Sequence, residues 1–167
     1  MDITLPDEGP TANCMPAELL ASSAFLIARM GYAIKARAVE EFELSGFSPP
    51  QYSVLALLEE GARDTQSAIA DALQLDRSQL VGLLDGLEDR GLVERRRDAD
   101  YRRRHVVTLT AAGRQQLIAF RAIVSRLERE FLAPLDLADR VALHRLLSRL
   151  AAGHDARYAG DRAAVAG

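Results

Sequence analysis

The sequence has little cysteine, few aromatic residues and no long apolar run. Its 167 residues include one cysteine, no tryptophan and only 5% aromatic residues. The lone Cys14 cannot form an intrachain disulfide, so we expect a reduced intracellular protein rather than a secreted one. No stretch approaches the roughly 18 consecutive apolar residues of a membrane span, and the first residues lack a signal-peptide pattern. The sequence therefore predicts a cytoplasmic protein without a membrane segment.

The chain also has no excess of positive charge. Its 21 Lys and Arg residues face 24 Asp and Glu residues, which gives a formal net charge of -3. A protein that coats nucleic acid by bulk charge alone is strongly basic, so any nucleic-acid binding must depend on local patterning. With 49% hydrophobic residues, the chain can bury the core of one domain or of two small fused units.

Apolar residues recur with helical spacing along most of the chain. This spacing and the capping residues predict four helices, over about 16–44, 48–61, 65–73 and 76–91. Alternation with period two then predicts strands over 92–97 and 105–110, joined by a hairpin loop. Two more helices are expected, one around 117–131 and one that opens at Asp136.

Two short helices followed at once by a hairpin make a winged helix-turn-helix pattern. On a helical wheel, the second helix has a core face of four leucines: Leu80, Leu83, Leu84 and Leu87. The opposite face presents Ser78 and Gln79, which can hydrogen-bond to base edges in the major groove of DNA. Beside them, Val81 can touch a thymine methyl group, and Gly82 lets the backbone approach the duplex closely. An ordinary solvated helix face would carry the same residue types.

The hairpin is locally basic. Seven of the 21 basic residues lie within 90–104, against three acidic residues. Arginine suits phosphate oxygens and guanine, and a narrow minor groove attracts it further. The arginines of the hairpin that we predict to contact DNA are Arg95, Arg97, Arg102, Arg103 and Arg104. The alternative is an edge hairpin that is protected from aggregation by its charge.

Four motifs stand in the stretch 48–113: S-P-P-Q-Y at a helix start, T-Q-S-A-I-A-D-A-L, the run D-R-S-Q-L-V-G-L-L-D-G-L-E-D-R-G-L-V-E-R, and L-T-A-A-G after the wing. Taken together, they resemble the MarR family of bacterial transcription regulators. The resemblance implies a homodimer whose two winged domains read a pseudo-palindromic operator in double-stranded DNA. It also implies repression of the protein's own or neighbouring genes, with release by a small aromatic or anionic effector. The positions near DNA that it implies outside the hairpin are Thr65, Gln66, Ser67, Ser78 and Gln79. We also predict that Arg77 contacts DNA.

The predicted fold class is mainly α with a small β-hairpin wing. We expect a flexible acidic arm over 1–15 and a dimerisation helix over 16–46. The winged helix-turn-helix DNA-binding domain would span 47–110, followed by C-terminal dimerisation helices over 111–152 and a flexible tail over 153–167.

The sequence also predicts residues for a dimer interface and for an effector pocket. Apolar residues spaced by 3, 4, 3 and 4 form a coiled-coil-like seam that requires a helical partner. With two leucines of the last helix, the predicted interface is Leu117, Phe120, Val124, Leu127, Phe131, Leu146 and Leu150. An effector pocket could be lined by Phe25, Met30 and Tyr52, for which an ordinary core role is the alternative.

The sequence departs from the family pattern in the wing and in the recognition helix. Tyr101 stands where the family's wing has an aspartate, and Gly82 and Gly86 stand where its helix often has arginine. We therefore expect the wing to supply an unusually large share of the affinity for DNA.

No catalytic or metal-binding constellation stands out, so an enzyme is not expected and no cofactor is predicted. Two rivals stay open: a winged-helix protein-interaction module without DNA binding, and a ligand carrier that does not regulate genes.

Overall fold

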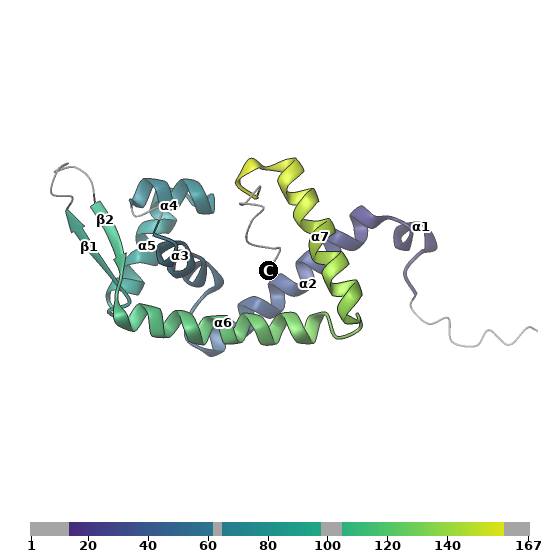
Figure 1. Cartoon of the computed structure of the whole chain (residues 1–167), viewed down its shortest axis with the longest axis horizontal. Coiled ribbons are helices and arrows are strands. Elements are labelled where there is room, and N and C mark those ends of the chain that lie inside the picture. The colour runs from purple at the N-terminus through teal and green to yellow at the C-terminus, as the bar shows by residue number, and fades with distance from the viewer. Residues whose placement is uncertain (1–13, 62–64, 98–104, 159–167) are drawn as a thin grey trace, which may run out of the picture. The chain divides into compact units, whose positions relative to one another are not determined.

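The protein is mainly α-helical with one two-stranded hairpin (Figure 1), which confirms the predicted fold class. The computed structural model describes residues 14–61, 65–97 and 105–158. Its elements are α1 (Ala17–Leu20), α2 (Ser23–Leu44), α3 (Pro49–Glu59), α4 (Gln66–Leu73), α5 (Arg77–Glu88), β1 (Val93–Arg97), β2 (His105–Leu109), α6 (Ala111–Phe131), α7 (Leu137–His154) and the short 3-10 helix η1 (Ala156–Tyr158). The chain divides within α2 into two units, Met1–Arg37 and Ala38–Gly167. In the part of the chain described, no helix is long and apolar enough to cross a membrane.

The first unit contains α1 and the N-terminal part of α2. The prediction of one continuous helix over 16–44 is wrong at Ala21 and Ser22, where the helix is interrupted. Serine favours such a break because its hydroxyl can cap a helix, and here Ser22 Oγ accepts a hydrogen bond from the Phe25 backbone N–H at 3.2 Å. The large apolar side chains that remain exposed in this unit are Met15, Leu19, Leu20, Leu26, Ile27, Met30 and Tyr32.

The second unit has one hydrophobic core, shared by the C-terminal part of α2, helices α3 to α6 and the hairpin. Phe120 of α6 is fully buried at its centre. The centre of its ring lies 5.2 Å from that of Phe42 and 4.9 Å from that of Phe47. Tyr52 of α3 completes the cluster, with its ring centre 6.2 Å from that of Phe120. The guanidinium of Arg90 covers the outer face of Phe47 at 4.2 Å from the ring centre, a favourable cation–π distance.

Helices of the second unit begin at the predicted capping residues. In α3, the side-chain oxygen of Gln51 accepts a hydrogen bond from the Ser48 backbone N–H at 2.9 Å. Asp76 and Gln79 form the same type of capping box at the start of α5. Asp136 caps α7 by accepting a hydrogen bond from the backbone of Asp139. These caps satisfy backbone N–H groups that have no partner inside the helix.

The root of the hairpin is fastened to the first turn of α6. β1 and β2 pair antiparallel, with Val93 opposite Leu109 at the root. The carbonyl oxygen of Leu92 accepts hydrogen bonds from the backbone N–H and the hydroxyl of Thr110, each at 3.1 Å. A Cβ on Gly113 would overlap that same carbonyl oxygen and would lie 2.7 Å from Cδ1 of Leu109. Only glycine fits at this position of the first turn.

The first residues of the predicted tail belong to helical elements. The expected flexible tail over 153–167 begins with the last turn of α7 and with η1. Arg157 in η1 donates a hydrogen bond to the backbone carbonyl of Asp71 near the end of α4, at 3.0 Å. Asp155 holds the same guanidinium, with its Oδ2 2.9 Å from Arg157 Nε. Hydrogen bonds from Arg157 lower the pKa of Asp155 to about 2. Residues 159–167 of the predicted tail lie outside the described residues.

Candidate nucleic-acid interface

Helices α4 and α5 form a helix-turn-helix. α4 ends at Gln74, whose φ of 53° places it in the left-handed region and reverses the chain direction. Asp76 then caps α5, so that three residues connect the two helices. α5 buries its predicted core face, with Leu83 half-buried beside three fully buried leucines. Those three are Leu80, Leu84 and Leu87.

The first two turns of α5 are exposed on the opposite face. Arg77, Ser78 and Gln79 are exposed there, and Val81 is 41% exposed although it is apolar. Nothing lies within 4 Å of the position that a Cβ of Gly82 would take, so the backbone is open to close approach. The structure thus brings five of the predicted DNA-contacting residues together on one continuous surface. Recognition helices use their N-terminal residues to contact base edges.

The capping group at the start of α5 engages the two polar side chains of this surface. Ser78 Oγ donates a hydrogen bond to Asp76 Oδ1 at 2.6 Å, and the backbone N–H of Gln79 donates to the same oxygen at 2.8 Å. In return, Gln79 Oε1 accepts a hydrogen bond from the Asp76 backbone N–H at 3.4 Å. The hydrogen bond from Ser78, followed by those from the backbone, lowers the pKa of Asp76 below its ordinary value.

The start of α4 carries three residues whose contacts with phosphate stay predictions. Thr65 is only 6% exposed, and its hydroxyl oxygen caps α4 by accepting a hydrogen bond from Ala68 N at 3.2 Å. Its backbone also forms a bridge to Val106 of β2, which the sequence did not indicate. Thr65 therefore has a structural role, while Gln66 is half-buried and Ser67 is exposed at the helix start.

Arg95 is also not a free cation. Its NH2 lies 2.6 Å from Asp85 Oδ1 and 2.5 Å from Glu88 Oε2, and its Nε lies 2.7 Å from Glu88 Oε2. The side chain is 22% exposed. The hydrogen bond with Glu88 raises the pKa of Arg95, and hydrogen bonds from Arg95 lower the pKa of Glu88. Two carboxylates of α5 already pair with this guanidinium, and a contact of Arg95 with DNA stays a prediction. The signal for this pairing is the spacing of three between the two acidic residues on α5, directly before β1.

The remaining arginines of the wing are described only in part. The backbone of Arg97 lies in β1 opposite His105. Arg102, Arg103 and Arg104 lie outside the described residues, so their predicted contacts with DNA stay predictions.

Comparison with known proteins identifies the fold. A family model described as the MarR family matches residues 45–104. A putative transcriptional regulatory protein for the hcr operon of Thauera aromatica is 31% identical over 150 residues, which cover 85% of this chain and 89% of that protein. The chain belongs to the MarR family. Its similarity to these proteins extends beyond the winged domain to the helices on both sides.

Two solved MarR-type structures show the same similarity over most of their length. A MarR-family transcriptional regulator from Rhodococcus sp. RHA1 is 28% identical, with a TM-score of 0.68, and the match covers 84% of this chain and 96% of that one. CouR from Rhodococcus jostii RHA1, solved bound to p-coumaroyl-CoA, is 28% identical with a TM-score of 0.67, over 82% of this chain and 94% of that one.

The dimer interface predicted for this MarR protein needs a correction at the beginning of α6. Leu117 and Phe120 are fully buried in the core of the same unit, and Leu127 is 5% exposed. Val124 packs against that core, and Phe131 is half-buried. The argument that this stripe requires a second chain is therefore wrong, because the chain's own helices cover Leu117 and Phe120. The apolar residues of α7 that do stay exposed are Leu137, Val141, Leu146, Leu147 and Leu150.

The predicted effector residues lie in different parts of the MarR chain. Phe25 and Met30 belong to the first unit, where Phe25 is half-buried and Met30 is 49% exposed. Tyr52 belongs to the second unit, where its ring packs against the rings of Phe42 and Phe120. For Tyr52 the core role is thus evident from its contacts. An effector contact at these three residues stays a prediction.

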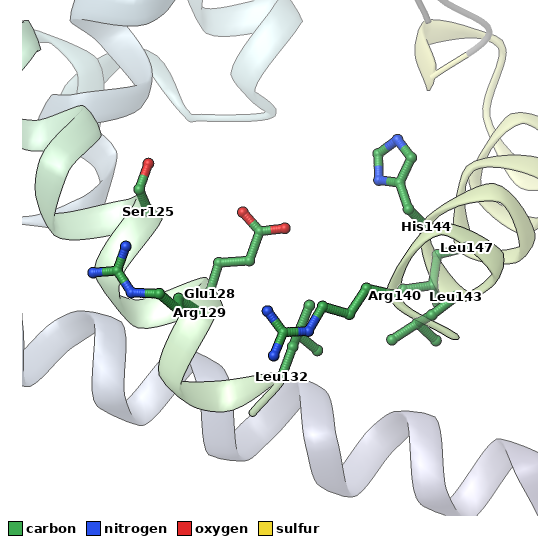
Figure 2. A pocket seen from close by; sticks show the side chains of 8 residues that line it. All are labelled: Ser125, Glu128, Arg129, Leu132, Arg140, Leu143, His144 and Leu147. Carbon is green, nitrogen blue, oxygen red and sulfur yellow. The ribbon is translucent and has the colours of Figure 1, made fainter. Parts of the chain in front are cut away.

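An open cavity of about 330 Å³ lies between α6 and α7 of the second unit. Its lining residues are Ser125, Glu128, Arg129, Leu132, Arg140, Leu143, His144 and Leu147. Figure 2 shows Glu128 and Arg129 on the α6 side of the opening and His144 on the α7 side. Arg140 is held at the base of α7, where its Nε donates to the Leu135 carbonyl at 3.0 Å. The lining combines three leucines with two arginines, a glutamate, a histidine and a serine.

Proposed function

We propose that this MarR protein is a transcriptional regulator, not an enzyme, that binds duplex DNA with the N-terminal half of α5 in the major groove. The observation that carries the proposal is the exposed surface from Arg77 to Gly82 on a helix whose opposite face is buried. Its relatives are named transcriptional regulators, which supports the same function. A regulator of this kind acts where chromosomal DNA is, in the bacterial cytoplasm.

Direct base contacts are confined to the first two turns of α5. Asp85, in the third turn, is bound to Arg95, and an aspartate there would repel a phosphate. Ser67 at the exposed start of α4 can hydrogen-bond to the phosphate backbone of the adjacent DNA strand. The arginines of the wing, from Arg97 to Arg104, would contact the neighbouring backbone or minor groove and supply much of the affinity.

Two copies of the chain would bind one operator. The exposed apolar residues of α7, Leu146 and Leu150 among them, are the surface in the second unit that a partner copy would cover. A two-fold symmetric dimer reads a pseudo-palindrome whose half-sites lie about one helical turn apart. Sedimentation at micromolar concentration tests this arrangement, and a monomer that still binds one operator with full affinity would contradict it.

The regulated step would be release of DNA by a small aromatic or anionic effector, with repression of the protein's own or neighbouring genes in its absence. The support is the complex of CouR with p-coumaroyl-CoA, an aromatic acyl thioester that carries phosphates. In the described second unit, the α6–α7 cavity offers such a ligand Arg129 and Arg140 beside leucines. Isothermal titration with p-coumarate and p-coumaroyl-CoA, on the chain and on its Arg129→Ala variant, tests this location.

The decisive experiment is fluorescence anisotropy of the full chain at about 0.15 M salt. It compares the DNA upstream of the protein's own gene with a scrambled duplex of equal length. Specific regulators prefer their site by about 10³-fold or more. Equal, weak binding to both duplexes, and to a pool of random duplexes, would favour the protein-interaction module instead. Ligand binding that leaves DNA affinity unchanged would favour a ligand carrier.

A further inference from the structure

The two polar side chains at the start of α5 are ambivalent hydrogen-bonding groups. A serine hydroxyl can donate or accept, and a glutamine amide has a donor end and an acceptor end. Either side chain could therefore present a hydrogen-bond donor or an acceptor to a base. Both, however, already make a hydrogen bond within the capping box. In each case the partner group can act only as a donor or only as an acceptor.

The polarity of Ser78 is set by the carboxylate of Asp76. Ser78 Oγ lies 2.6 Å from Asp76 Oδ1, and the lowered pKa of this exposed carboxyl keeps it ionised near neutral pH. An ionised carboxylate only accepts hydrogen bonds, so the hydroxyl hydrogen must point at Asp76. The lone pairs of Ser78 Oγ are what remains for an outside partner.

The polarity of Gln79 is set by a backbone N–H. Its side-chain oxygen lies 3.4 Å from the Asp76 backbone nitrogen, which can only donate. The oxygen of the amide is therefore turned toward the cap, and the NH₂ group with its two hydrogens remains. The residue itself is exposed on the open face of the helix, so these donors are accessible.

We infer that the capping box fixes the reading polarity of this helix, with Gln79 as a donor that selects guanine and Ser78 as an acceptor that selects a base with an amino group. This inference rests on the proposed DNA binding. In the major groove, guanine presents two acceptors, N7 and O6, whereas cytosine and adenine present amino donors. The bidentate contact of glutamine with adenine needs the amide oxygen and the NH₂ group to face the same base, whereas here the oxygen is turned toward the cap. Asp76 acts as a positioning residue, since it orients Ser78 without contacting a base.

The test uses the full chain and duplexes selected from a random pool by wild-type protein. Gln79→Glu keeps an oxygen for the Asp76 N–H but replaces the two donors by an acceptor. The matched control is Gln51→Glu, which makes the same change at the same position of the α3 capping box. We expect wild type and the control to prefer guanine at one position of each half-site. In Gln79→Glu, the preference for guanine at that position should fall by about tenfold or more, and cytosine should be favoured instead.

An atomic substitution in the DNA and a second variant pair complete the test. Replacing the selected guanine by 7-deazaguanine, which lacks the N7 acceptor, should weaken wild-type binding and leave Gln79→Ala unaffected. Asp76→Ala should reduce the preference for an amino-bearing base at the neighbouring position read by Ser78. Asp76→Asn, which keeps a side-chain acceptor oxygen, should restore that preference.

The outcomes separate the inference from the function on which it rests. Wild-type protein that selects no duplex overturns both. Selective binding with a guanine preference unchanged in Gln79→Glu, or with no response to 7-deazaguanine, overturns the assignment of Gln79 alone. A preference at the neighbouring position that survives Asp76→Ala overturns the positioning role of Asp76.

Discussion

Replacing Phe120 by alanine should destabilise the fold by about 3–5 kcal/mol without changing the assembly state of the protein. The side chain is fully buried, and its ring lies within 4.9 to 6.2 Å of three other aromatic rings of the same unit. Loss of a buried phenylalanine removes its transfer free energy and leaves a cavity that the surroundings fill only in part, which gives this magnitude. The aromatic pairs add about 0.5–1.5 kcal/mol each beyond the buried area.

Urea unfolding followed by circular dichroism measures the free energy of unfolding, and sedimentation velocity measures the assembly state. Both are run on Phe120→Ala and on the control Ile118→Ala, which lies on the same helix but is 57% exposed. The control should change the free energy of unfolding by less than about 1 kcal/mol, as expected for an exposed site without special contacts. Phe120→Ala should unfold at much lower urea concentration, while the folded protein keeps the sedimentation coefficient of wild type.

The opposite pattern would refute the reasoning. Phe120→Ala could instead give a folded monomer whose free energy of unfolding lies within about 1 kcal/mol of that of wild type. The ring would then belong to a subunit interface. The intrachain aromatic cluster would then be the wrong account of its burial.

Three further predictions concern charge, close packing and acid titration. Arg95→Ala should leave the slope of log affinity against log salt unchanged because its guanidinium is bound by carboxylates of α5, whereas Arg77→Ala should flatten that slope by about one. Gly113→Ala should lower the free energy of unfolding by about 1–3 kcal/mol through overpacking. Gly82→Ala, in open space within a helix, should raise the free energy of unfolding by up to about 1 kcal/mol. Urea unfolding measures both changes. The carboxyl of Asp155 should titrate by NMR with a midpoint near 2 in the folded protein, and Arg157→Ala should raise the midpoint only part of the way toward 3.8, because the backbone N–H of residue 157 still donates to Asp155. Because folding lowers this pKa, the contribution of the pair to stability is present above about pH 4 and disappears toward pH 2.

Local signals in the sequence were sufficient for the helix-turn-helix. Ser48 and Asp76 each precede a glutamine by three residues, and such capping boxes depend only on neighbours in the chain. The exposed face of α5 followed from helical geometry alone, since its leucines define the opposite side. These features could be predicted because each is settled within one turn of helix.

Features that depend on distant partners were predicted less well. The 3–4 spacing on α6 correctly indicated that Leu117 and Phe120 need a helical partner, but spacing cannot distinguish a second chain from α3 of the same chain. The arginine content of the wing likewise did not reveal that Arg95 faces two carboxylates of α5. Thr65 carried a capping signal, whereas its bridge to β2 involves a residue 41 positions away.

The attachment of the hairpin root to α6 has a mechanical consequence. The close approach at Gly113 and the hydrogen bonds from Thr110 to the Leu92 carbonyl tie the hairpin root to the helix. Farther along, Arg126 of α6 makes a two-pronged ion pair with Glu41 of α2, at 3.1 and 2.5 Å. The 21 residues of α6 thus form a stiff lever of about 31 Å that carries the wing at one end. A tilt of only about 5° about the far end would move the hairpin root by about 3 Å, a full hydrogen-bond length, so a small repacking beside α7 would shift the wing by that distance relative to the proposed DNA partner.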